Sequence, residues 1–265
     1  MSITAISYGG GVQSTALAVL ATQGRIDVDV AIFANVGDRA ENPATLNYLA
    51  MFVPWAADLG LEVIERRWVD RTGKARDLYD DCMTEGRRSI DIPVRMNGGA
   101  FGHRKCTDRY KIAVVGRELR VRGASPANPA TVMVGISTDE YQRANRRHAK
   151  PWELPTYPLL DLGLSRRDCE QIIVDAGLPI PPKSSCWFCP MQGPKGWANR
   201  RRSDPVTFVA GIELERRLNE TRVAMGRDEV YLGAPGVLLE DMPDDDPTLF
   251  DAFNDGRCDE GYCWT

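Results

Sequence analysis

The chain has 265 residues, of which 43% are hydrophobic and 26% are charged, a balance typical of a soluble globular protein. Its formal net charge of -4 excludes a global basic field for nucleic acid, and no apolar run approaches the ~20 residues that span a bilayer. Because Met1–Ser7 carries no basic leader region, we expect a cytoplasmic protein with no membrane partner.

Strand and helix patterns alternate along the chain. Apolar, β-branched runs predict strands at Ile3–Ser7, Val28–Ala34, Leu61–Glu65 and Thr131–Ile136. Apolar residues at helical spacing predict helices at Ser14–Gln23, Ala44–Leu59, Asp108–Arg122, Ser165–Ala176 and Asp204–Asn219. This alternation indicates an α/β fold with a parallel sheet, whose ligands bind beyond the carboxyl ends of the strands.

Two stretches are less regular. Residues 70–105 lack a clear period and predict a long loop, of the kind that is functional or mobile. A proline-rich break at Pro179–Pro182 predicts two regions, an α/β domain over 1–178 and a cysteine-bearing part over 179–265. From about residue 230 the composition, rich in Asp, Gly and Pro, predicts an extended acidic tail.

A glycine-rich turn, Gly9-Gly10-Gly11-Val12-Gln13-Ser14, joins the first strand to the first helix. Such a turn binds anions, because backbone N–H groups and the helix dipole face the ligand and glycine lets a phosphate approach closely. A Walker A loop is excluded because no lysine is present, and a Rossmann fingerprint is met only as Gly-x-Gly-x-x-Ser. A plain strand–turn–helix connection is the remaining alternative.

Seven cysteines in a cytoplasmic chain favour metal or redox chemistry over structural disulfides. Cys186 and Cys189 form a Cys-x-x-Cys motif, which can hold a metal or cluster, act as a dithiol, or be simply buried. Cys106 begins a predicted helix and follows the basic run His103–Lys105, and both features favour a thiolate.

The chain resembles the PP-loop ATP-pyrophosphatase superfamily, in the phosphoadenylyl-sulfate (PAPS) reductase-like branch found in phages and bacteria. The segment Gly9–Ser14 is similar to the family's Ser-Gly-Gly-x-Asp-Ser, with Gly9 in place of serine and Gln13 in place of aspartate. Cys106 followed by Lys111, and then by Cys186-x-x-Cys189, is similar to the Cys-Cys-x-x-Arg-Lys and Cys-x-x-Cys motifs of cluster-bearing members. Thr107 stands where those members have their second cysteine.

The resemblance implies a PP-loop (adenine nucleotide alpha hydrolase-like) fold and a site for ATP, adenylyl sulfate or PAPS. The implied phosphate-binding residues are Ser7, Gly9, Gly10, Gly11, Gln13, Ser14 and Thr15. The implied nucleoside-binding residues are Ala34, Asn35, Gly37 and Asp38. The segment Gly135–Arg143 resembles the family's Gly-hydrophobic-Arg-x-x-Glu-x-x-Arg, in which Glu140 would orient an anion or help hold Mg²⁺. Lys111 and Arg143 would then neutralise charge during catalysis.

The implied metal ligands are Cys106, Cys186 and Cys189, holding a [4Fe–4S] cluster or, alternatively, zinc. Because Thr107 replaces a ligand, the fourth position would be taken by Cys169, Cys258 or Cys263, or would stay open.

Three functions fit these expectations. The favoured one is adenylation of a nucleic acid or nucleotide by ATP, followed by sulfur transfer from a sulfur donor. The second is a reductase in which the tail thiol of Cys263 attacks adenylyl sulfate and releases sulfite, with a thiol reductant to restore it. The third is a zinc-stabilised nucleotide-binding module without catalysis. Thr107 and the absence of a Glu-Cys-Gly tail motif favour the first.

Overall fold

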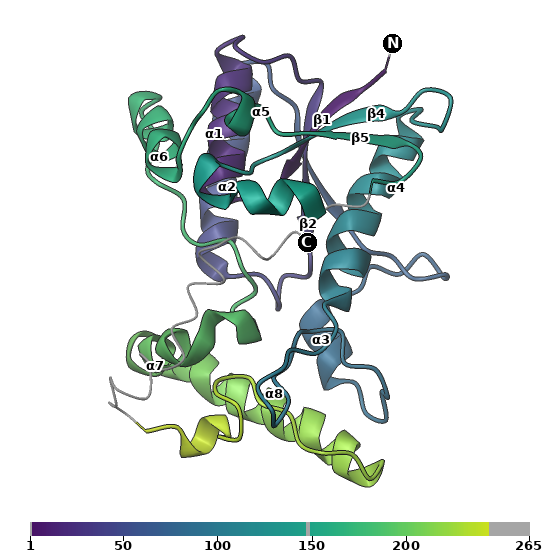
Figure 1. The fold of residues 1–265 in the computed structure, drawn as a ribbon, viewed down its shortest axis with the longest axis vertical. Helices are drawn as coiled ribbons and strands as arrows, with labels where there is room; N and C mark the ends of the chain where they lie inside the picture. Colours follow the sequence, from purple (N-terminus) through teal and green to yellow (C-terminus); the bar gives the residue numbers. More distant parts are fainter. Residues whose placement is uncertain (1, 147–148, 244–265) are drawn as a thin grey trace.

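The computed structural model describes residues 2–146 and 149–243, and within these ranges five parallel strands form one sheet in the order β3-β2-β1-β4-β5 (Figure 1). The strands are β1 (Thr4–Tyr8), β2 (Val30–Asn35), β3 (Val63–Arg67), β4 (Ala130–Val134) and β5 (Glu153–Thr156). The predicted α/β class with a parallel sheet is therefore confirmed. Ser7 in the central strand pairs with Ile32 of β2 and with Val134 of β4.

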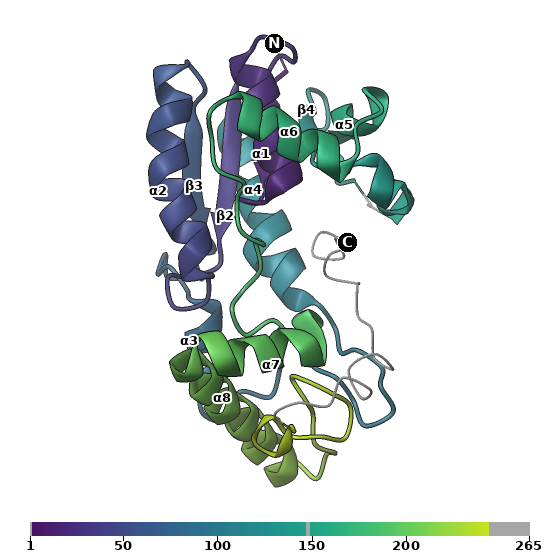
Figure 2. The same ribbon diagram turned by 90° about the vertical axis from the view of Figure 1, so that its left-hand side faces the viewer.

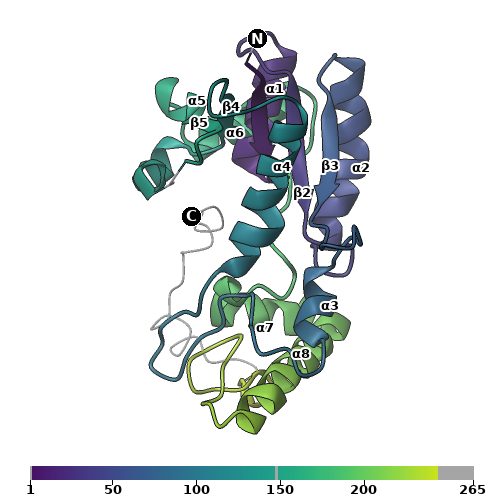
Figure 3. The ribbon, with the colours of Figure 1, turned by 90° about the vertical axis from the view of Figure 1, so that its right-hand side faces the viewer.

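Helices cover both faces of the sheet. The helices are α1 (Val12–Thr22), α2 (Pro43–Asp58), α3 (Leu78–Met83), α4 (Ala113–Val121), α5 (Pro158–Asp161), α6 (Arg166–Asp175), α7 (Gly193–Ser203) and α8 (Pro205–Ala224). Figure 2 shows α1 and α6 in front of the strands, and the opposite view in Figure 3 shows α4 in front. Successive residues of a strand point to opposite faces, so Ile6 packs with α1 and α2 while Ala5 packs with α4.

The predicted elements differ from the structure in two informative places. The strand β5 was not predicted, because Glu153–Thr156 is short and contains Pro155, which a sheet tolerates at its edge. The predicted helix Asp108–Arg122 begins as a π-helix over Thr107–Ile112 and continues as α4. The other short turns of helix are the 3-10 segments Thr138–Arg146, Pro190–Gln192 and Leu239–Asp241.

A second hydrophobic cluster lies beyond the sheet and gathers α3, α7, α8 and residues 230–242 (Figure 1). Val230, Leu232 and Leu239 are fully buried in it, so the prediction of an extended tail from about residue 230 is wrong as far as residue 242. This cluster also takes residues from both sides of the predicted boundary at 178, since Val36 packs in it together with Trp197.

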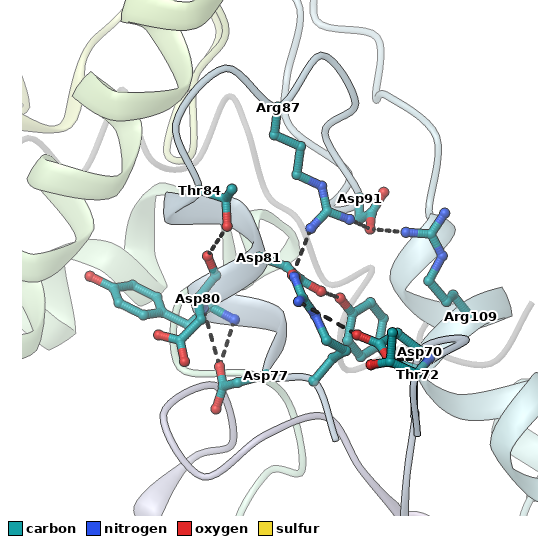
Figure 4. Close-up of polar contacts among 12 residues, drawn as sticks. Asp70, Thr72, Asp77, Asp80, Asp81, Thr84, Arg87, Asp91 and Arg109 are labelled. Atoms are coloured by element: carbon teal, nitrogen blue, oxygen red, sulfur yellow. Dashed lines mark hydrogen bonds and ion pairs between the residues drawn. The ribbon is translucent and has the colours of Figure 1, made fainter. Parts of the chain in front are cut away.

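The predicted loop over 70–105 instead contains α3 and a buried network of charges, drawn in Figure 4. Asp81 and Asp91 are almost wholly buried, and Arg87 pairs with both, at 2.9 Å from Asp81. Arg109 approaches Asp91 at 2.8 Å, and Tyr110 donates a hydrogen bond to Asp81. The network therefore ties this segment to the π-helix Thr107–Ile112.

The length and polarity of the helices bear on whether any of them could cross a membrane. Within the described ranges, none combines the length and the apolar character that crossing a bilayer requires. The longest one, α8, spans Pro205–Ala224 and carries charged side chains along its length.

Candidate functional site

The glycine turn at Gly9–Gly11, here called the phosphate loop, leaves the carboxyl end of β1 and leads directly into α1. The strand order places the change of winding direction between β1 and β4. Doubly wound sheets bind ligands in the crevice at this point, beyond the strand ends. The first N–H groups of α1 have no partner within the helix, and no side chain caps it at Gly11.

Two glycines allow the close packing that shapes the phosphate loop. Gly10 has φ +71°, and a Cβ placed there would lie 2.9 Å from Cγ2 of Thr45. A Cβ on Gly135 would lie 2.8 Å from the backbone nitrogen of Ser14, so the exit of β4 rests against the first turn of α1. The Ser14 hydroxyl accepts a hydrogen bond from Gly9 N at 3.2 Å and donates to Gly11 O at 3.1 Å. The structure thus brings three predicted segments together, namely the loop, α1 and Gly135.

The exit of β2 is a tightly hydrogen-bonded turn. The buried Asn35 accepts a hydrogen bond from Gly37 N at 2.7 Å and donates to Glu65 at 3.0 Å. Asp38 pairs with Arg67, whose hydrogen bond lowers the pKa of that carboxyl. These side-chain contacts hold the turn that follows β2 in place.

Glu140 and Arg143 lie on the 3-10 segment that follows β4, and both are about 3% exposed. They form an ion pair with each other. Burial raises the pKa of Glu140, and Arg143 opposes this shift. Within the described residues, Nε and Nη2 of Arg143 have no hydrogen-bond partner. A buried N–H donor without an acceptor lowers the stability of the fold. An anion that accepted hydrogen bonds from this guanidinium would remove that penalty.

Three of the predicted ligands line one pocket, although their side chains do not converge as a metal site in the described residues. Cys106, Cys186 and Cys189 line a single pocket, here called the thiol pocket, and Lys111 lies in its wall. The remaining lining residues are Val36, Pro93, Arg104, Thr107, Ser185 and Met191. Cys106 directly precedes the π-helix, where its N–H donates to Asp91 O at 2.7 Å. Residues that lie far apart in the sequence therefore contribute thiols and cations to the same pocket.

The cysteine segment is anchored at two points to the turn that follows β2. The Trp187 indole donates to Arg39 O at 2.6 Å, and Trp187 N donates to Ala40 O at 3.3 Å. A Cβ on Gly11 would lie 2.7 Å from the Ser184 hydroxyl, so this serine rests on the phosphate loop. The contact joins residues far apart in the sequence, and nothing in the local pattern could have predicted it. The phosphate loop and the thiol pocket are therefore neighbours.

Other predicted ligands lie elsewhere. Cys169 is fully buried in α6 against α1, in a different hydrophobic cluster from Cys106 and Cys186, and burial raises the pKa of its thiol to about 12. The structure therefore does not bring it to the thiol pocket, and it packs as a core residue. Cys258 and Cys263 lie outside the described residues. Among the described residues, no three His, Cys, Asp or Glu side chains converge as a ready-made metal site.

Glu41 is a buried carboxyl beside the thiol pocket, and it accepts a hydrogen bond from Val36 N at 3.3 Å. Burial raises its pKa, while the charge of Lys111 lowers it.

Comparison with protein-family models and with curated proteins finds no match to this chain. The features of the molecule that bear on its function are the phosphate loop, Arg143 and the thiol pocket.

Proposed function

We propose that this chain is a PP-loop-type enzyme that uses ATP to adenylate an acceptor oxygen and then replaces that oxygen with sulfur. The carrying observation is the placement of the phosphate loop at the switch point of the sheet, with Ser184 linking it to the thiol pocket. The acceptor would be a nucleic acid or a nucleotide, in line with the resemblance of the sequence motifs.

The nucleotide would bind with its phosphates at the phosphate loop and the first turn of α1. Ser7 lies in β1, Gly9 in the turn, and Gln13 and Thr15 in the first turn of α1, while Gly10 has positive φ. Thr15 is fully buried, and its hydroxyl lies 3.2 Å from that of Tyr8. The guanidinium of Arg143 offers two buried nitrogens to an oxyanion. The main chain of Ala34–Asp38 would hold the adenosine part.

The proposed reaction has two displacements. The carbonyl oxygen of the acceptor attacks the α-phosphorus of ATP, and the bond from that phosphorus to pyrophosphate breaks. A sulfur donor at the oxidation level of sulfide then attacks the acceptor carbon, and the carbon–oxygen bond to AMP breaks, so no net oxidation occurs. Lys111 and Arg143 would neutralise the charge that develops on the phosphoryl oxygens.

The thiol pocket would serve the sulfur step. Cysteine thiolates, usually four of them, are the ligands with which proteins hold iron–sulfur clusters, and thiolates equally suit zinc. Cys106, Cys186 and Cys189 would hold such a group, which would supply a place to bind sulfide. A fourth ligand would have to come from outside the pocket, where Cys258 and Cys263 are the candidates left, or the position would stay open. Mg²⁺ would accompany ATP, with Glu140 as a nearby carboxylate.

The experiment uses the full chain purified without oxygen. ATP binding is measured by calorimetry, and release of AMP and pyrophosphate is measured with candidate acceptors. We expect Arg143→Met to weaken ATP binding about tenfold or more, because a hydrogen bond to a charged group contributes about 1.5–3 kcal/mol. Arg120→Met, on the exposed side of α4, is the matched control and should leave binding unchanged.

Each result separates the three functions. Absence of binding by any adenine nucleotide would overturn the proposal. Release of sulfite from adenylyl sulfate that is lost in Cys263→Ser, without cleavage of ATP, would identify a reductase. Nucleotide binding with stoichiometric zinc and no turnover would identify the non-catalytic module.

A further inference from the structure

A groove runs along α8 and shares no lining residue with the thiol pocket. Its cavity has a volume of about 530 Å³, within the range of ligand-binding pockets. One wall is α8 between Ile212 and Ala224, and the other comes from the segment that follows the helix. The residues that line it are Ile212, Glu215, Arg216, Asn219, Glu220, Val223, Ala224, Glu229, Leu238 and Glu240. We call it the α8 groove.

The two walls of the α8 groove are held together by buried polar side chains. Both carboxylate oxygens of Glu215 accept backbone hydrogen bonds, from Leu232 N at 2.7 Å and Leu239 N at 2.6 Å. The Asn219 amide donates to Val230 O at 2.9 Å and accepts from Val230 N at 2.8 Å. These four hydrogen bonds fix the second wall against the helix, so the shape of the groove is set by the fold.

The helix also presents an apolar stripe to solvent beside this groove. Val206, Val209 and Val223 are 81%, 62% and 61% exposed. Val209, Ile212 and Val223 recur at helical spacing and share one face of α8, and Leu238 faces it from the other wall. Arg216 and Glu220 lie on the same face between Ile212 and Val223, so the surface combines exposed apolar side chains with charged ones.

The charges in the groove are predominantly negative. Glu215, Glu220, Glu229 and Glu240 line it against a single cation, Arg216, among the lining residues of the described chain. Arg216 pairs with Glu240 at 3.6 Å and with Glu213 at 3.0 Å, and Arg217, outside the groove lining, pairs with Glu220 at 3.0 Å. Glu215 is buried and bound to two backbone N–H groups, so the exposed negative charge of the groove comes from Glu220, Glu229 and Glu240. A symmetric contact with a second copy would set these carboxylates against one another. Residues 244–265 of the same chain are also a poor occupant, because seven acidic residues and one arginine give them a negative charge like that of the groove.

We propose that the α8 groove binds a basic amphipathic helix of a partner protein. The apolar side of that helix would lie on Ile212, Val223 and Leu238, and its lysines or arginines would meet Glu220, Glu229 and Glu240. Residues 212–224 of α8 cover about 18 Å, enough for roughly three turns of a docked helix. Recognition by an apolar stripe flanked by charges is the helix-in-groove mode of peptide binding.

The test uses a fluorescent helical peptide of leucine and lysine, with leucines at helical spacing, titrated with the full chain. Binding is followed by fluorescence anisotropy at low and high salt. A second peptide with glutamate in place of lysine is the charge control. We expect saturable binding of the lysine peptide that weakens with salt, because exposed charges are screened, and no binding of the glutamate peptide.

Two pairs of variants locate the binding. Val223→Ser should weaken it by about three- to tenfold, since an exposed valine that becomes buried contributes about 1 kcal/mol. Val121→Ser, at a valine that is 76% exposed on α4, should not change it. Glu229→Lys should weaken binding and reduce its salt dependence, whereas Asp58→Lys at the end of α2 should do neither.

Equal binding of both peptides, or equal affinity in all four variants, would overturn the proposal. So would a dimer of the free protein, seen by sedimentation velocity, that Val223→Ser dissociates, because the groove would then be a contact between copies. Loss of binding that is confined to Val223→Ser and Glu229→Lys, in variants that unfold like the wild type, would support it.

Discussion

Replacing Asp91 with alanine removes the centre of the buried charge network that holds the π-helix Thr107–Ile112 (Figure 4). The Asp91 carboxylate receives Arg87 and, at 2.8 Å, Arg109, and it accepts a hydrogen bond from Ser89 at 3.2 Å. The variant leaves two guanidinium groups without this partner. Because Cys106 binds the backbone carbonyl of Asp91, that contact does not depend on the side chain.

The expected loss of stability follows from burial. Removing one partner of a buried ion pair costs about 3–5 kcal/mol, because a charge stays desolvated. Arg87 retains Asp81 at 2.9 Å, and Arg109 is partly exposed, so water compensates some of the loss. We therefore expect the free energy of unfolding to fall by about 2–3 kcal/mol in Asp91→Ala.

The assay is equilibrium unfolding in urea, followed by tryptophan fluorescence. Asp80→Ala is the matched control, since Asp80 lies in the same segment and pairs with Arg39 at the surface. Exposed ion pairs contribute about 0–1 kcal/mol, so this variant should unfold close to the wild type. If the two variants lost the same stability, the assignment of Asp91 as the centre of a stabilising network would be refuted.

Three further predictions concern other parts of the molecule. Burial raises the pKa of Glu215 from 4.5 to about 7, so its contribution to the free energy of unfolding should fall as pH rises through this range; urea unfolding on either side of the range should show a smaller pH dependence in Glu215→Gln. Gly10→Ala adds a crowded Cβ at φ +71° and should cost about 1–3 kcal/mol and weaken ATP binding, whereas Gly24→Ala, at φ +69° with open space around it, should cost less in the same assays. Anaerobic protein should lose its iron, sulfide or zinc in the double variant Cys186→Ser/Cys189→Ser, and elemental analysis that finds equal metal in both proteins would exclude these ligands.

The sequence was most informative where the structure is local. The strand β2 follows a continuous apolar run, Val30–Ala34, and Gly10 sits at a turn that requires positive φ, so pattern and turn chemistry were sufficient there. The edge strand β5 was missed because its residues carry no apolar period. The buried segment at 230–242 was missed because the stretch from about 230 to the end was judged by its overall content of Asp, Gly and Pro, although residues 230–242 are themselves mostly apolar. Glu215 and Asn219 fix this segment by hydrogen bonds.

In the candidate site, too, local features could be predicted from the sequence and long-range contacts could not. Cys186 and Cys189 were recognised from their spacing, but their meeting with Cys106 depends on how α3, the π-helix and α7 pack. Cys169 was a plausible ligand by residue type, and only its position between α6 and α1 shows that it is a core residue. The burial of Arg143 could not be predicted either, since its sequence neighbours are polar.

Ser184 contacts the phosphate loop and Trp187 is hydrogen-bonded to the turn after β2, so the segment between them connects these two turns. Two residues of extended chain span at most ~7 Å, so Cys186 cannot separate far from the phosphate loop while Ser184 rests on it. Trp187 is held separately by hydrogen bonds to Arg39 O and Ala40 O, so the segment from Ser184 to Trp187 ties the turn after β2 to the loop after β1.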